Sequence, residues 1–266
     1  MKILYIGDIM AEAGIKTVEK LLPGLRSELG VDVAIAQAEN VTDGKGISKV
    51  DYVRLQKAGV DAFTGGNWSL YNDEIHAHLS DPQQPIVRPA NYPEGTLGQR
   101  YKVVKTPKGV VLIISLLGAI VGRDADKPTD NPLQVIDEIL DETKDHAKVA
   151  TVVNFHGDFS SEKIIIGYYL DGQVSLVIGD HWHVPTADAM ILPKGTAHQT
   201  DVGMCGALHA SLGISLDSVI PRWHDNIKTR NELETSGPFQ FNALLVDVNE
   251  ETGLASSVEP IQRFIG

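Results

Sequence analysis

The pattern that decides the fold lies in residues 1–40, MKILYIGDIMAEAGIKTVEKLLPGLRSELGVDVAIAQAEN. An apolar run at 3–6 predicts a strand, the amphipathic stretch 15–29 predicts a helix, and the β-branched run 32–36 predicts a second strand. A strand, a helix and a strand in this order are typical of a βαβ unit, in which a helix joins two parallel strands. The sequence therefore predicts the α/β class, with helices on the faces of a central sheet.

The same alternation continues along the chain. Further strands are predicted at 62–64, 101–105, 110–115, 150–154 and 174–178, and further helices at 49–58, 72–79, 132–143 and 161–170. In the last third, strand-like runs at 190–192, 239–248 and 254–261 and a helix near 216–228 continue or flank the sheet. Because no internal repeat and no Pro/Ser-rich linker interrupts the chain, residues 1–266 are predicted to form a single domain.

Composition narrows the partners that this chain can have. Its 23 lysines and arginines against 35 aspartates and glutamates give a net charge of −12, without a basic cluster. Stable binding of nucleic acids relies on such clusters to neutralise phosphates, so no stable nucleic-acid complex is expected. The single cysteine, Cys205, cannot form an internal disulfide, which favours the cytoplasm. The longest apolar stretch, 110–121, is too short to span a membrane.

Residues with metal-binding side chains follow the predicted strands, where ligands of α/β sheets bind. Two carboxylates, two amides and three imidazoles stand at the ends of five strands: Asp8, Glu39, Asn40, Asn67, His156, His181 and His183. Taken singly, each is more simply explained as a helix cap, a turn residue or a hydrogen-bonded core histidine. Their convergence on one edge of the sheet instead predicts a metal site.

The pair His181 and His183 strengthens this hypothesis, because residues i and i+2 of an extended strand point to the same side. Oxygen and nitrogen donors without thiolate suit zinc, manganese or iron, and seven ligands are too many for one tetrahedral ion. Two divalent ions that share a carboxylate are the simplest arrangement. Ions held roughly 3.5–4 Å apart create a hydroxide nucleophile and stabilise the attacking and leaving oxygens of a phosphoester. The predicted chemistry is phosphoester hydrolysis.

Other catalytic motifs are missing. The glycine-rich stretch 42–48, TDGKGIS, lacks the order of a phosphate-binding P-loop, and no G-x-G-x-x-G follows the first strand. Gly44 and Gly46 are instead predicted to shape a turn. The sequence also has no G-x-S-x-G elbow for a nucleophilic serine.

Five short motifs resemble those of the calcineurin-like metallophosphoesterases: Gly7-Asp8, Ala38-Glu39-Asn40, Gly66-Asn67, Phe155-His156 and Gly179-Asp180-His181-Trp182-His183. Within that superfamily the chain resembles the YmdB-like bacterial phosphodiesterases, also over 88–95, 161–163, 192–197 and 200–204. The resemblance implies a four-layer α/β/β/α sandwich. It also implies hydrolysis of cyclic nucleotides, 2′,3′-cyclic or 3′,5′-cyclic, often by a homo-oligomer.

The same resemblance implies how the seven candidate residues divide between two divalent ions of iron, manganese or zinc. Asp8, Asn40 and His183 would bind one ion, Asn67, His156 and His181 would bind the other, and Glu39 would bridge them.

One position departs from the family pattern. The family has Gly-Asn-His, whose histidine protonates or stabilises the leaving group, whereas this chain has Gly66-Asn67-Trp68. An indole N–H donates hydrogen bonds but is no usable acid near neutral pH, and general acid catalysis contributes about 10²–10⁴-fold. The chain is therefore either a phosphodiesterase with reduced or altered activity, or a metal- or nucleotide-binding regulatory protein with little or no turnover. Trp68 and Trp182 would stack on a base or pack as a pocket wall.

Overall fold

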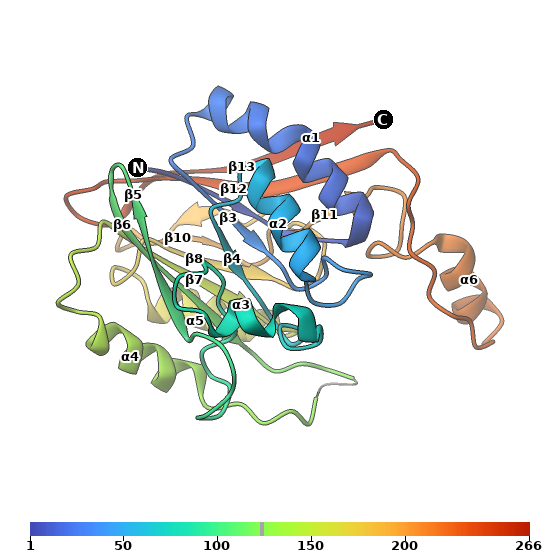
Figure 1. The fold of residues 1–266 in the computed structure, drawn as a ribbon, viewed down its shortest axis with the longest axis horizontal. Coiled ribbons are helices and arrows are strands. Elements are labelled where there is room, and N and C mark those ends of the chain that lie inside the picture. The colour runs from blue at the N-terminus through green and yellow to red at the C-terminus, as the bar shows by residue number, and fades with distance from the viewer. Residues whose placement is uncertain (123–124) are drawn as a thin grey trace.

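The computed structural model describes residues 1–122 and 125–266, whose strands form two β-sheets that pack face to face (Figure 1). The larger sheet contains, in spatial order, β2 (Asp8–Ile9), β11 (Met204–Ala207), β12 (Phe239–Val248), β1 (Lys2–Ile6), β3 (Val33–Gln37) and β4 (Ala62–Thr64), with β13 (Ala255–Ile265) paired to β12. The smaller sheet contains β5 (Tyr101–Thr106), β6 (Gly109–Leu117), β7 (Ala150–His156), β8 (Leu176–Asp180), β10 (Ala197–Gln199) and β9 (Met190–Ile191). The α/β class is confirmed, whereas the prediction of one central sheet is wrong.

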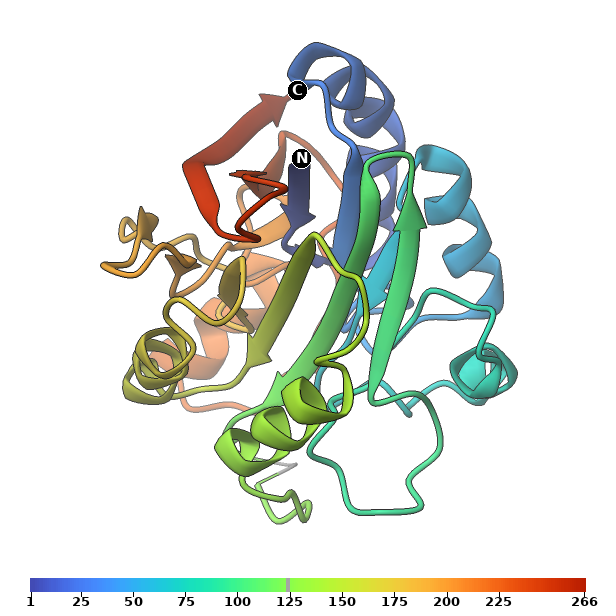
Figure 2. The same ribbon diagram turned by 90° about the vertical axis from the view of Figure 1, so that its left-hand side faces the viewer.

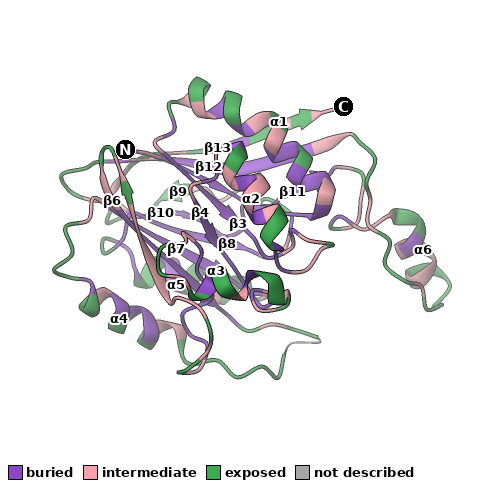
Figure 3. Cartoon of the chain, viewed as in Figure 1, coloured by how far each residue is buried: buried purple, intermediate pink, exposed green. Residues whose placement is uncertain are grey.

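Both faces of β1 are buried, which explains its continuous apolar run. Leu4 and Ile6 pack in the core under the helices, whereas Ile3 and Tyr5 pack in the core between the two sheets. Alternate residues of a strand point to opposite faces, so one strand serves two cores. Figure 3 shows the burial of the central strands of both sheets.

Helices cover the outer face of each sheet. α1 (Ala11–Leu29) and α2 (Lys49–Ala58) pack on the larger sheet, and α4 (Pro132–Glu142) and α5 (Ser160–Tyr169) pack on the smaller one (Figure 2). The layers are therefore α/β/β/α, as the resemblance implies. The connections contain η1 (Asp73–Ile75), α3 (His76–Ser80) and α6 (Leu216–His224). None of the helices in the described residues is long and apolar enough to cross a membrane.

Three strands are not predicted from the sequence: β2, β10 and β11. They have two to four residues each, too few for an alternating pattern to be recognised. The predicted helix at 72–79 is a 3-10 turn followed by the short α3, and α6 ends at His224 rather than near 228. The other predicted helices and strands are present with small differences at their ends.

The carboxyl ends of parallel strands from both sheets meet at one end of the sandwich. In the larger sheet β1, β3 and β4 run parallel, and in the smaller sheet β6, β7 and β8 run parallel. The backbone N–H of His181, which follows β8, donates to Oδ2 of Asp8, which follows β1, at 3.1 Å. Side chains that the sequence places at strand ends are therefore gathered from two sheets rather than along one edge.

Candidate metal centre

The seven predicted metal ligands come together where the two sheets meet. The larger sheet supplies Asp8 in β2, Glu39 and Asn40 after β3, and Asn67 after β4. The smaller sheet supplies His156 at the end of β7, and His181 and His183 after β8. Each sheet thus carries part of the candidate site, so the site depends on how the two sheets pack.

One group of side chains surrounds Nε2 of His183. This nitrogen lies 3.2 Å from Oδ1 of Asn40 and 4.0 Å from Oδ2 of Asp8. Ligand atoms bound at 2.0–2.2 Å to one ion lie about 3 Å or more from one another. These three side chains are therefore spaced as ligands of a single cation.

A second group surrounds His156. Its Nε2 lies 3.1 Å from Oδ1 of Asn67 and 3.9 Å from Oε1 of Glu39, and its ring centroid lies 4.5 Å from that of His181. Burial, together with the nearby His156, lowers the pKa of His181 to about 3, so the ring is neutral and can ligate. The second group also has the donors and the spacing of a cation site.

His183 and His156 each have oxygen atoms next to both ring nitrogens, but a neutral imidazole has only one N–H to donate. Nδ1 of His183 lies 3.2 Å from the carbonyl oxygen of Leu212, while its Nε2 faces the oxygen of Asn40, whose amide nitrogen donates to Gly44. Burial lowers the pKa of His183 to about 4, so the ring carries one N–H for two oxygens. Whichever tautomer forms, one nitrogen lone pair points at an oxygen. A cation between them removes this repulsion.

The ring of His156 has the same problem. Its Nδ1 lies 2.6 Å from Oδ1 of Asp180 and its Nε2 lies 3.1 Å from the amide oxygen of Asn67. Burial keeps the pKa of His156 well below its usual value, and the short contact with Asp180 takes the single N–H. Nε2 is then a lone pair that faces an oxygen. The residues present therefore fit two cations, one beside each histidine.

The buried carboxylates fit cations as well. Asp8 and Glu39 are fully buried, and burial raises the pKa of both well above the usual value. Oδ1 of Asp8 has no hydrogen-bond partner among the described residues, and Oε2 of Glu39 accepts from the backbone N–H of Gly66 at 2.6 Å. Oε1 of Glu39 accepts from the backbone N–H of Trp68. Buried carboxylates that lack a compensating charge are costly, and divalent cations would supply that charge.

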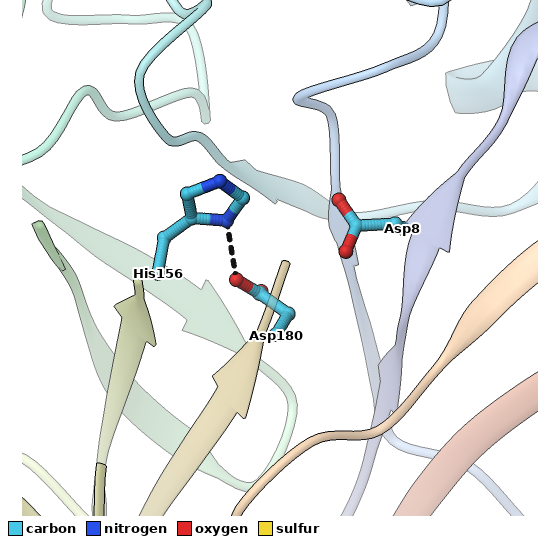
Figure 4. A group of neighbouring side chains, drawn as sticks. All are labelled: Asp8, His156 and Asp180. Carbon is cyan, nitrogen blue, oxygen red and sulfur yellow. Dashed lines mark hydrogen bonds and ion pairs between the residues drawn. The ribbon is translucent and has the colours of Figure 1, made fainter. Parts of the chain in front are cut away.

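Asp180 is a site residue that the sequence reasoning missed, although it stands in one of the quoted motifs. Figure 4 shows it between His156 and Asp8. Its carboxylate accepts from Nδ1 of His156 and also from Tyr5, Gln37 and Asn154 at 2.5–3.0 Å. With these partners it orients the imidazole and fixes its tautomer, as carboxylates behind metal-binding histidines do. The signal was available, because a carboxylate at a strand end follows the same rule as Asp8.

The conformation predicted for His181 and His183 is wrong. The two residues lie in a bend after β8 and have φ values of 104° and 62°, in the left-handed region that residues with side chains rarely adopt. Both still line one cavity, because the bend turns their side chains to the same side. The turn rather than an extended strand brings the two rings together.

A buried ion pair supports this turn from beneath. Nζ of Lys163 donates to the carbonyl oxygen of Asp180 at 2.6 Å and to Oδ2 of Asp201 at 2.9 Å. The same ammonium lies 3.9 Å from the ring centroid of Trp182, whose backbone N–H donates to Asp201 at 2.9 Å. Lys163 and Asp201 are both completely buried. Together they fix the backbone between the two histidines, which carry strained φ values.

Replacing Lys163 by methionine is expected to lower the free energy of unfolding by about 3–5 kcal/mol, because Asp201 then stays buried without a partner. Adding Asp201→Asn removes this charge, so the double variant should be more stable than the sum of the two single effects predicts. Urea unfolding in EDTA measures all three variants, with Lys20→Met on the exposed side of α1 as the control. Strictly additive losses would show that the two side chains do not act as a pair.

Trp68 forms part of the wall of the cavity at the candidate centre. This cavity has a volume of about 330 Å³ and is lined by Glu39, Asn40, Trp68, Asp158, His181, Trp182, His183 and Leu212. The indole of Trp182 donates to the carbonyl oxygen of Asp158 at 3.0 Å and covers Lys163, which supports a packing role. Trp68 is half-buried, and no hydrogen bond from its indole N–H is found in the described residues.

Comparison with known proteins agrees with the metal centre that the geometry indicates. Residues 4–261 match the sequence model of a family described as YmdB-like protein. The 2′,3′-cyclic-nucleotide 2′-phosphodiesterase of Bacillus subtilis is 35% identical over 261 residues, which are 98% of this chain and 96% of the relative.

Two solved structures share the whole fold. A novel phosphatase of Mycoplasma pneumoniae superposes with a TM-score of 0.90 at 30% identity, over 99% of this chain and 93% of the other. A hypothetical protein of Thermus thermophilus superposes with a TM-score of 0.88 at 34% identity, over 99% of both chains.

Proposed function

The chain belongs to the YmdB-like family of metal-dependent phosphoesterases, and on this premise we propose that it hydrolyses cyclic nucleotides at a centre of two divalent ions. The name of the Bacillus subtilis relative supports 2′,3′-cyclic nucleotides first, with 3′,5′-cyclic nucleotides as the other expected class. A cytoplasmic location and assembly into a homo-oligomer remain predictions.

We infer the ligands from the two groups of side chains. Asp8, Asn40 and His183 would hold one ion, Asn67, His156 and His181 the other, and Glu39 would be shared between them. The observation that carries the proposal is that each histidine directs a nitrogen lone pair at an oxygen: His156 at that of Asn67, and His183 at that of Asn40 or of Leu212, depending on its tautomer. Iron, manganese and zinc all suit this set of nitrogen and oxygen donors.

The residues of the chain have separate roles in this reaction. Asp180 holds the N–H of His156 and so keeps Nε2 directed at the site, and Lys163 with Asp201 holds the turn of His181 and His183. The backbone N–H groups of Gly66 and Trp68 fix the carboxylate of Glu39. When bound, two divalent ions supply an activated water and Lewis-acid stabilisation of the phosphoryl oxygens.

Trp68 favours a second candidate function. It stands where the resemblance implies a histidine that serves the leaving group, and its indole cannot supply a proton. A regulatory protein that binds metal or a nucleotide with little or no turnover would need the metal ligands but not a histidine that protonates the leaving group. The two functions differ in turnover but not in metal content.

Metal analysis together with an activity assay tests the proposal. The purified protein is expected to contain about two metal ions per chain after incubation with Mn²⁺, and to hydrolyse bis-p-nitrophenyl phosphate and 2′,3′-cyclic AMP. Elemental analysis and absorbance or chromatography measure the two quantities on the same sample. Two ions without turnover on either diester would favour the regulatory protein, and no bound ion after incubation would contradict the site itself.

A further inference from the structure

A second and larger cavity adjoins the candidate metal centre. It has a volume of about 1250 Å³, against about 330 Å³ for the cavity at the centre. Its wall is formed by Met10 and three further parts of the chain: residues 42–45 after β3, residues 71–74 before α3, and a stretch around α6 that includes Ile214, Arg222 and residues 229–233. A cyclic mononucleotide whose phosphate is bound at the centre leaves most of this space empty.

Three side chains form the rim between the two cavities. Trp68 lines the smaller cavity, and Lys45 and Tyr71 line the larger one. The ring centroids of Trp68 and Tyr71 lie 5.1 Å apart in an edge-to-face contact. Nζ of Lys45 lies 4.7 Å from the ring centroid of Trp68 and 5.3 Å from that of Tyr71. The rim therefore presents two aromatic rings and the charge of Lys45, and Nζ of Lys127 lies farther out, 5.6 Å from the ring centroid of Trp68.

The ammonium group of Lys45 has no anionic partner in the described part of the chain. Within residues 1–122 and 125–266 it makes no ion pair and no hydrogen bond, and its side chain is only half-buried. The two aromatic contacts hold the charge in place but use none of its three N–H donors. An ammonium group fixed in this way at the edge of a cavity can bind a phosphate.

The loop that carries Lys45 is tied to the metal centre. The backbone N–H of Gly46 donates to the carbonyl oxygen of Glu39 at 2.5 Å, and the side chain of Asn40 donates to the carbonyl oxygen of Gly44 at 2.9 Å. Gly44 and Gly46 have φ values of 80° and 63°, so these glycines shape the predicted turn. The position of Lys45 is thus fixed relative to two of the candidate ligands.

We propose that the substrate is the end of a short oligonucleotide, with its terminal cyclic phosphate at the metal centre and its next phosphate on Lys45. This inference rests on the proposed function, because it extends the substrate of the same site. Trp68 and Tyr71 offer ring faces and edges to the nucleoside between the two phosphates, as aromatic side chains do in single-strand binding sites. The larger cavity takes the preceding nucleoside.

The remaining charges of the larger cavity limit the length of this substrate. Two arginines line the cavity, Arg222 and Arg230, and Arg222 donates only to neutral oxygens of Thr229 and Asn231 within the described residues. Four carboxylates also line the cavity: Asp43, Asp73, Glu74 and Glu232. Since these repel a long run of phosphates, the site suits one additional phosphate and not an extended strand, which agrees with the net charge of −12.

The test compares two substrates that differ by one nucleotide. With Mn²⁺ bound, the dinucleotide ApA that ends in a 2′,3′-cyclic phosphate is expected to show a kcat/KM about tenfold above that of 2′,3′-cyclic AMP, as one hydrogen-bonded charge contact provides. In Lys45→Met this preference is expected to fall to within about twofold. Lys49→Met, an exposed lysine at the start of α2, is the matched control and should keep the preference. Equal kcat/KM values for the two substrates in the unmodified protein would overturn the inference.

A binding measurement separates this inference from the proposed function. Calorimetry with the linear ligands adenosine 3′-phosphate and ApA 3′-phosphate needs no turnover. The dinucleotide is expected to bind the Mn²⁺-loaded protein about tenfold more tightly, and Lys45→Met should remove this difference. If both cyclic substrates stay intact, the proposed hydrolysis is wrong while the affinities still decide the subsite. Equal affinities, or a difference that survives in Lys45→Met, contradict the subsite whether or not the protein turns over.

Discussion

A Glu39→Gln variant is expected to retain one metal ion or none per chain and to lose activity by about 10³-fold or more, since Lewis-acid stabilisation contributes several kcal/mol. Both oxygens of Glu39 accept backbone N–H groups, from Gly66 and Trp68. An amide has one oxygen, so its NH₂ group would face one of these donors. The substitution removes the negative charge that is proposed to be shared by the two ions, and it also disturbs the orientation of the side chain.

Metal content, kcat/KM on bis-p-nitrophenyl phosphate and the far-ultraviolet circular dichroism spectrum should be measured on the same preparation. Glu28→Gln, on the exposed side of α1, is the matched control and should keep both metals and activity. A folded Glu39→Gln variant that keeps two ions and activity within tenfold of the original would show that Glu39 is not the bridging ligand.

The seven candidate residues were identified because ligands of α/β sheets bind at the carboxyl ends of the strands, and this did not require knowing how many sheets the strands form. This identification depends only on the carboxyl ends of parallel strands, which meet at one end of the sandwich. The number of sheets could not be obtained in this way. Strand β12 pairs with β1 although more than 200 residues separate them in the sequence. The hydrophobic pattern of a strand does not predict which other strand it pairs with. A fully buried strand looks the same in one sheet as in two.

The supporting residues were missed for a different reason. Lys163 is a charged side chain on a helix, and a pattern of charges on a helix indicates an exposed face. It is buried because Asp201 and the carbonyl oxygen of Asp180 lie within hydrogen-bond distance of its ammonium group. This ion pair forms only when α5 packs on the smaller sheet, so no local pattern in the sequence predicts it.

The assignment of the seven ligands to two ions stays a prediction, which metal analysis of single variants tests.

Replacing Trp68 by histidine is expected to raise kcat by about 10²-fold on diesters with a poor leaving group, such as 2′,3′-cyclic AMP. An imidazole can protonate the leaving oxygen near neutral pH, whereas the indole of Trp68 cannot. Bis-p-nitrophenyl phosphate needs no proton at its leaving group and should gain little. The ratio of the two gains, from steady-state rates with Mn²⁺ present, is therefore the quantity to measure. Trp223→His, which replaces an 81% exposed tryptophan on α6, is the control.

A Trp68→Ala variant distinguishes the loss of an acid from the bulk of the indole. The ring of Trp68 borders the cavity at the metal centre and is held by Tyr71 and Lys45, so its removal also opens space. If steric hindrance limits the rate, Trp68→Ala and Trp68→His should raise turnover equally on both diesters. If the missing acid limits the rate, only Trp68→His should gain, and only on the poor leaving group. No gain in either variant, with two ions bound, would mean that the indole does not limit turnover and would leave the regulatory function as the better explanation of a slow protein.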